Sequence, residues 1–221
     1  MTTDRYFKEL DRNGGSQTVA HVKNVGMLMK EFAKPLKQSP IIYKKAGELH
    51  DAGKIFIPPH VLGSTKKLSE GEKKIIRSHP TAATGVIGNM EGLTPEEKKA
   101  AYECAWYHHA WYNGQFYSPT THDGGYYKGM DYDTEHSFAG ENIPLIARVG
   151  AIADGYDAMT SNRSYQKART PQQALDIIAE QCAKGQYDYY LCIVLAGSVL
   201  GKNVKEFAQN VQKYRDIARI A

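Results

Sequence analysis

The chain has 221 residues, a formal net charge of +4 and 42% hydrophobic residues. This length fits one domain with its own core, and so mild a charge argues against a nucleic-acid binder while suiting an anionic small-molecule substrate. The three cysteines lack metal-binding spacing, and neither a signal-peptide core nor an apolar run of roughly 18 residues occurs, so we expect a cytoplasmic protein without membrane spans.

The first two predicted helices lie near the N-terminus. Apolar side chains recur at helical spacing over residues 17–32. Pro35 and Pro40 separate this segment from a second helix over residues 41–51, and Gly53 marks the end of that helix.

Three later helices begin with capping boxes, in which a hydroxyl and the third following side chain satisfy free backbone donors. The cap residues are Ser69, Thr94 and Thr170. No useful period-2 strand pattern occurs, and the remaining helices are expected at residues 70–77, 79–89, 95–109, 144–161, 171–184, 188–200 and 203–219. The sequence therefore predicts an all-α fold, a compact bundle of about seven to nine helices in a single domain spanning residues 1–221.

Residues 111–142 interrupt the helical pattern with a segment that contains five tyrosines and five glycines. So long a loop in a compact domain is usually functional or disordered. We favour an ordered flap, and the alternative is a variable surface insertion. The acidic stretch at residues 131–136 is a weak candidate for an extra cation site, and a solvated loop is the favoured interpretation.

Five of the eight histidines lie within otherwise apolar, helical stretches. A lone histidine in such a place is more often a core residue with a hydrogen-bond partner than a ligand. Burial of five imidazoles requires partners, and a pair of metal ions would supply them together. An aspartate directly follows the second of these histidines, and mixed nitrogen and oxygen ligation suits iron, manganese or zinc. The five are His21, His50, His79, His108 and His109.

The segment His50-Asp51-Ala-Gly-Lys54 resembles the signature of HD-domain phosphohydrolases of the HD-GYP subfamily. The pair His108-His109 and the run Ala153-Asp154-Gly-Tyr-Asp157 follow in the expected order, and the resemblance covers about residues 17–195. It implies that two divalent ions, iron or manganese with magnesium, zinc or nickel as alternatives, are bound by His21, His50, Asp51, His79, His108, His109 and Asp154.

The resemblance also implies roles beyond metal binding. Asp51 and Lys54 would be catalytic, since paired cations activate water for in-line attack on a phosphate and a lysine adds fixed positive charge. Arg163, Lys167 and Tyr126 would contact the substrate.

One further carboxylate lies close to these positions. Asp157 follows Asp154 by three residues, so it shares that helix face and is expected to orient the site rather than to bind metal. Alternatively, Arg163 forms a structural salt bridge with Asp157. His60 follows two prolines and is expected to be structural or exposed.

Several positions depart from the family pattern. Gln17 replaces a glutamate found in some members, which favours two metals over three, and Ala110 replaces a glutamate after the paired histidines. The Gly-Tyr-Pro motif survives only as remnants at residues 114–119 and 124–129. Gln166 replaces a possible phosphate-binding lysine, for which Lys167 is the candidate substitute. These losses fall on the substrate side of the predicted site.

The leading hypothesis is therefore a metal-dependent phosphodiesterase that hydrolyses a cyclic dinucleotide, cyclic di-GMP or a related one. One alternative is a phosphohydrolase of nucleotide monophosphates or other phosphomonoesters. Another is a non-catalytic domain that binds a nucleotide or a protein. The expected partner is an anionic, phosphate-containing small molecule, with homodimerisation possible and neither nucleic acid nor membrane involved.

Overall fold

The computed structural model describes residues 1–114, 139–162 and 167–220. Within these ranges every regular element is helical, which confirms the all-α prediction. The predicted substrate contacts of Tyr126 and Arg163 lie outside the described residues. So do the acidic stretch at residues 131–136 and most of both Gly-Tyr-Pro remnants.

The first helix, α1 (Thr3–Ala33), begins much earlier than the predicted residue 17. The Thr2 side chain accepts a hydrogen bond from the third following backbone N–H, and Tyr6 and Leu10 are buried one turn apart. Gly15 interrupts the helix with a φ of 72°, a left-handed conformation that glycine adopts without strain. The predicted start was wrong because the non-helical backbone at Gly15 breaks the helical spacing, so the apolar positions before and after it do not follow one continuous period.

The second helix, α2 (Pro40–Leu49), ends two residues before the predicted boundary, and a 3₁₀ helix, η1 (Ala52–Phe56), follows. The prediction that helix α2 continues through Asp51 is therefore wrong. A Cβ atom at Gly53 would collide with the carbonyl oxygen of His79, so η1 packs directly against the start of the fifth helix. A short helix that was not predicted, α3 (Pro59–Leu62), comes next.

All three predicted capping boxes are present, each with both of its reciprocal hydrogen bonds. They begin the helices α4 (Glu70–Arg77), α6 (Pro95–Tyr107) and α8 (Pro171–Ala183). The helix α5 (His79–Gly88) follows α4 after one residue. Helix α6 ends at Tyr107 rather than at the predicted residue 109, which leaves the paired histidines just beyond its last turn.

The C-terminal half contains three further helices and two short elements. A 3₁₀ turn, η2 (Gly140–Asn142), precedes α7 (Leu145–Thr160), and Pro144 caps α7 instead of beginning it. The predicted helix at residues 188–200 divides into α9 (Tyr189–Val194) and a π-helical turn, η3 (Leu195–Val199). The last helix is α10 (Val204–Ile220).

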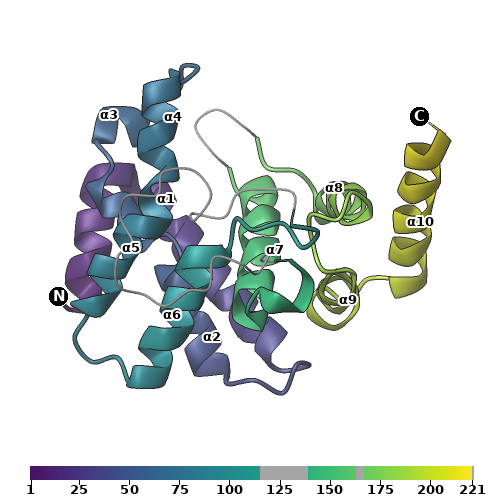
Figure 1. The fold of residues 1–221 in the computed structure, drawn as a ribbon, viewed down its shortest axis with the longest axis horizontal. Coiled ribbons are helices and arrows are strands. Elements are labelled where there is room, and N and C mark those ends of the chain that lie inside the picture. Colours follow the sequence, from purple (N-terminus) through teal and green to yellow (C-terminus); the bar gives the residue numbers. More distant parts are fainter. Residues whose placement is uncertain (115–138, 163–166, 221) are drawn as a thin grey trace.

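Helix α7 lies between two groups of helices, with α1 to α6 on one side and α8 to α10 on the other (Figure 1). Its buried residues Val149, Ile152 and Ala153 belong to the largest core cluster. All three cysteines are buried and free. Among the described residues, no helix is both long and apolar enough to cross a membrane. The central place of α7 lets its carboxylates reach side chains of the first group.

Candidate metal centre

The predicted metal ligands come from several helices, and most of them lie at a helix end. His50 and Asp51 follow the last turn of α2, His79 opens α5, and the paired histidines follow α6. His21 and Asp154 project from the interiors of α1 and α7. The fold brings all seven predicted ligands into one cluster, which no local stretch of sequence could do.

Asp51 lies at the centre of this cluster and is almost fully buried. Its Oδ1 atom is 3.1 Å from Nε2 of His79 and 3.9 Å from Nε2 of His108. Its Oδ2 atom is 3.3 Å from Nε2 of His50 and 3.8 Å from Nε2 of His21. Each carboxylate oxygen therefore faces a different pair of imidazoles, an arrangement suited to bridging two cations.

Backbone carbonyl groups orient three of the imidazoles. The Nδ1 atoms of His50, His79 and His108 lie 2.7 to 3.1 Å from carbonyl oxygens three or four residues earlier. A carbonyl oxygen only accepts hydrogen bonds, so each Nδ1 atom donates, which leaves Nε2 as the ring atom that can bind a cation beside Asp51. Nε2 of His50 is buried without a hydrogen-bond partner in the part of the chain that the structure describes. A bound metal ion would satisfy this atom.

Two carboxylates hold His21. Its Nδ1 atom is 2.6 Å from Oδ2 of Asp157, and its Nε2 atom is 3.1 Å from Oδ1 of Asp154. Ser161 donates a hydrogen bond of 2.8 Å to the other oxygen of Asp157. Burial lowers the pKa of His21, but the hydrogen bonds to Asp154 and Asp157 outweigh it and raise the pKa to about 9. Asp157 contacts Nδ1 of His21, the ring nitrogen that faces away from the cluster. A residue that orients a metal ligand makes this kind of contact.

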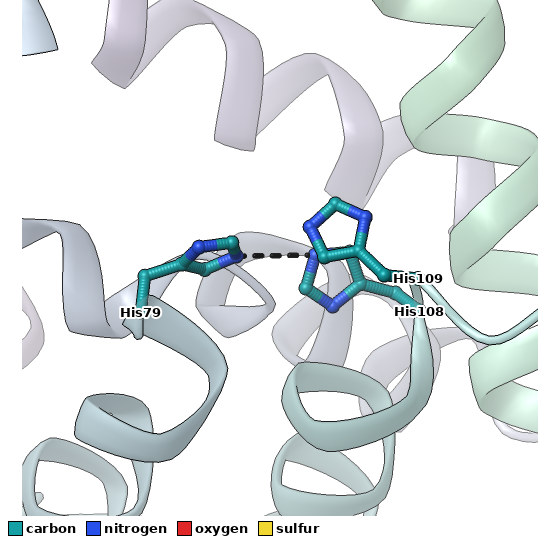
Figure 2. A group of neighbouring side chains, drawn as sticks. All are labelled: His79, His108 and His109. Atoms are coloured by element: carbon teal, nitrogen blue, oxygen red, sulfur yellow. Dashed lines mark hydrogen bonds between the residues drawn. The ribbon is translucent and has the colours of Figure 1, made fainter. Parts of the chain in front are cut away.

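Three imidazoles lie together at the opposite end of the cluster. Figure 2 shows His79 facing His108 and His109, with the Nε2 atoms of His79 and His108 3.4 Å apart. Burial and neighbouring histidines hold the pKa of His108 well below its usual value and lower that of His109 to about 4. These rings are neutral near pH 7, the state in which histidine binds a metal.

Lys54 approaches the same carboxylate from η1. Its Nζ atom lies 2.5 Å from Oδ2 of Asp51. Burial acts to raise the pKa of Asp51, but the charges of His50 and Lys54 outweigh it and hold the pKa well below its usual range. Asp51 is therefore ionised at neutral pH, the state in which a carboxylate can bind a cation.

Three overlapping groups of side chains have ligand atoms within 4.8 Å of one another. They are His79, His108 and His109; His21, His50 and Asp51; and His50, His108 and Asp154. Imidazole nitrogens combined with carboxylate oxygens suit divalent transition metals. The residues present thus fit the metal ions expected from the sequence.

A cavity of about 330 Å³ opens on the imidazole end, and we call it the aromatic cavity. Trp111 and Tyr187 line it together with Ala110, so the loss of the family glutamate leaves this wall apolar. A Cβ atom at Gly155 would collide with the Tyr187 hydroxyl, so the glycine after Asp154 makes room for that ring. The sequence did not indicate Tyr187, because it lies in a turn after α8 that carries no motif.

A second cavity, of about 530 Å³, opens on the other end, and we call it the basic cavity. His21 and Lys54 line it, and so do Gln17, Lys66 and Lys67. The two loop lysines were also missed, although their run after Ser64-Thr65 is a polar, basic signal in the sequence. Lys167 is exposed and lines neither cavity, and His60 is exposed as expected.

Sequence comparison finds several bacterial relatives. A cyclic di-GMP phosphodiesterase of Pseudomonas aeruginosa is 30% identical over 166 residues, which cover 74% of this chain and 35% of that protein. The response regulator RpfG of Xanthomonas campestris, also a cyclic di-GMP phosphodiesterase, is 30% identical, with 77% and 40% covered. A 3′3′-cGAMP-specific phosphodiesterase of Vibrio cholerae is 28% identical, with 77% and 29% covered. The chain therefore spans less than half the length of these relatives.

Structural comparison gives the same fold. The HD domain of the L. monocytogenes phosphodiesterase PgpH, solved in complex with cyclic-di-AMP, is similar with a TM-score of 0.53 and 13% identity. The match covers 96% of each chain. The family profile described as HD domain matches residues 15–191, which includes every residue of the cluster. The family predicted from the sequence is confirmed, and the chain belongs to the HD domain family.

Proposed function

We propose that this chain is a metal-dependent phosphodiesterase that hydrolyses a cyclic dinucleotide. Two divalent metal ions, iron or manganese, would be held by the cluster around Asp51. Relatives named as cyclic di-GMP and 3′3′-cGAMP phosphodiesterases support the substrate class. The proposed ligands are His21, His50, Asp51, His79, His108, His109 and Asp154.

One observation carries the proposal: the Nε2 atoms of four histidines converge on one buried carboxylate. The Nδ1 atoms of His50, His79 and His108 donate to backbone carbonyls, so these rings cannot turn their Nε2 atoms away from Asp51 without losing a hydrogen bond. Packing of a core does not require this arrangement, whereas the binding of two metal ions does.

Divalent cations bound in this cluster would lower the pKa of a water molecule and neutralise phosphate charge. The chain supplies the remaining elements of the reaction. Lys54 places a positive charge beside Asp51, where a phosphate would gain negative charge during in-line attack. Asp51 holds no proton at neutral pH, so it accepts hydrogen bonds and orients the attacking water.

The aromatic cavity suits one base of the substrate. Trp111 and Tyr187 offer ring faces for stacking, and Gln186 offers an amide that can donate to and accept from a base edge. The cavity volume of about 330 Å³ lies within the range of small-molecule sites.

The test is turnover by purified protein loaded with iron or manganese. Cyclic di-GMP, 3′3′-cGAMP and cyclic di-AMP are incubated separately, and linear products are identified by mass. We expect at least one of them to be linearised, and we expect a chelator to abolish the reaction.

Two other outcomes would overturn the proposal. Release of inorganic phosphate from nucleotide monophosphates, without cleavage of any dinucleotide, would identify a phosphomonoesterase instead. Less than one metal ion per chain after metal-replete purification would indicate a non-catalytic binding domain.

Some predictions from the sequence stay predictions. They include the single domain over residues 1–221, the homodimer and the cytoplasmic location. Substrate contacts by Tyr126, Arg163 and Lys167 also remain proposals. Variants at these three positions, tested by the change in KM for a cyclic dinucleotide, would decide them.

A further inference from the structure

The basic cavity differs in charge from the rest of the centre. Lys54, Lys66 and Lys67 line it, and its lining contains no carboxylate side chain. Within the described ranges, the ammonium groups of Lys66 and Lys67 form no ion pair, whereas Lys54 is bound to Asp51. Lys66 and Lys67 thus line a cavity that adjoins the metal centre, and neither has an anionic partner among the described residues.

The backbone around the loop lysines is ordered by local hydrogen bonds. The hydroxyl of Ser64 accepts a hydrogen bond from the backbone N–H of Lys66, at 3.2 Å, and donates one to the Lys66 carbonyl, at 3.3 Å. The hydroxyls of Thr18, Ser64 and Thr65 lie in the same lining. Hydroxyl and ammonium groups together are the donors that a phosphate uses.

The kink in α1 shapes the opposite wall of this cavity. Gly15 departs from helical geometry with a φ of 72°, and Gly14 lines the cavity. A Cβ atom at Gly14 would lie 2.9 Å from a methyl group of Leu62, so the missing side chain allows α3 to approach α1 closely. The cavity is thus a product of the fold and not of a single surface loop.

We propose that the basic cavity binds the second, uncleaved phosphate of a substrate that carries two, through Lys66 and Lys67. This inference rests on the proposed function. A cyclic dinucleotide holds its two phosphates on opposite sides of one ring. When one phosphate lies beside Lys54 and Asp51, the other lies across the ring from it, and the basic cavity has Lys54 in its own lining.

The aromatic cavity is the competing place for that phosphate. Among its lining residues Arg77 is cationic, but Asp154 brings a carboxylate, and Ile76, Ala110 and Ala151 make part of the wall apolar. The basic cavity has three lysines in its lining and no carboxylate. Its positive charge therefore favours the second phosphate, and the aromatic cavity is better suited to a base.

The test compares a double variant, Lys66→Gln with Lys67→Gln, against two substrates. One is the cyclic dinucleotide cleaved best by the wild type, and the other is bis(p-nitrophenyl) phosphate, which has a single phosphate. We expect KM for the dinucleotide to rise about tenfold because two lysine–phosphate contacts are lost, while kcat changes little. Hydrolysis of bis(p-nitrophenyl) phosphate should stay unchanged, and Lys66→Arg with Lys67→Arg should restore most of the affinity.

The matched control is Lys202→Gln with Lys205→Gln. It removes the same charge from two exposed positions, one just before α10 and one in its first turn. An unchanged KM in the Lys66/Lys67 variant, or an equal loss with both substrates, would overturn the subsite. A tenfold rise in KM for Arg77→Gln alone, with no effect of the lysine pair, would move the phosphate to the aromatic cavity.

A further set of substrates, nucleoside 3′,5′-bisphosphates, lets the subsite and the proposed function fail separately. If the wild type cleaves only bisphosphates and the lysine pair lowers their affinity, the subsite holds and the cyclic-dinucleotide assignment is wrong. If the wild type cleaves only substrates with one phosphate, both are wrong.

Discussion

His21 and His109 belong to the same cluster, yet their pKa values shift in opposite directions. His21 lies between Asp154 and Asp157, and its pKa rises to about 9. His109 lies beside other imidazoles, and burial lowers its pKa to about 4. In the metal-free protein His21 therefore carries a proton near pH 7, while His109 is neutral and ready to bind a cation.

The difference shows that histidines at the two ends of one cluster can have different protonation states because their neighbours differ. Asp51 joins the ends, since each of its oxygens faces a different pair of rings. A cation at the His21 end must displace a proton, and a cation at the His109 end need not. Under the proposal of two bound metals, the two ends should thus differ in affinity and in pH dependence.

The largest expected effect comes from Asp51→Asn, which acts on both ends at once. Loss of a residue that only orients a ligand already costs about 10- to 100-fold, so loss of a shared ligand should lower activity by more than about 1000-fold. Elemental analysis should show that both metals are depleted. Asp216→Asn, at an exposed position on α10, is the control. Retention of one metal at full occupancy would mean that Asp51 serves only one end.

Lys54→Met should have the next largest effect. Nζ of Lys54 contacts the Oδ2 atom of Asp51, the oxygen that faces His21 and His50. Because a fixed positive charge near the reacting phosphate is lost, we expect kcat to fall about 100-fold or more while both metals stay bound. Steady-state kinetics together with metal analysis separates these effects. A loss of metal in proportion to activity would show that Lys54 supports the centre rather than the reaction.

Asp157→Asn should affect the His21 end alone. The amide cannot hold the Nδ1 proton of His21 as strongly as a carboxylate, so metal affinity at this end should fall about 10- to 100-fold. In the metal-free protein, NMR titration should show a lower pKa for His21 and no change for His109. Ser161→Ala removes a hydrogen bond that orients Asp157 through its far oxygen, so metal affinity at the His21 end should fall less than in Asp157→Asn.

The smallest expected effect is on the stability of the metal-free protein as the pH changes. The pKa of His21 is about 9 in the folded state, above the usual value of about 6.5 for an unfolded chain. Its stabilising contribution is therefore complete below pH 6.5 and is lost as the pH rises through 9. Melting temperatures measured with chelator should fall by a few degrees across this window. If the melting temperature of His21→Asn fell equally over this pH range, His21 would not be the group responsible.

Local hydrogen bonding explains which helices could be predicted. The capping boxes at Ser69, Thr94 and Thr170 each involve four consecutive residues, so their chemistry is readable without the fold. The early start of α1 was missed because its N-terminal half packs through Tyr6 and Leu10, ahead of a kink at Gly15. The end of α2 was misplaced because the turn at Gly53 is shaped by contact with α5, far along the chain.

The candidate metal centre likewise has some features that could be predicted from the sequence and others that could not. The order and identity of its histidines and aspartates, with His50 next to Asp51, could be read from the sequence, and so could the family that the order implies. Only the tertiary structure decided that carboxylates surround His21 and imidazoles surround His109, and that an aromatic and a basic cavity adjoin opposite ends. Protonation and cavity charge depend on burial and on neighbours from distant helices. These quantities arise when the helices pack, and no spacing along the chain encodes them.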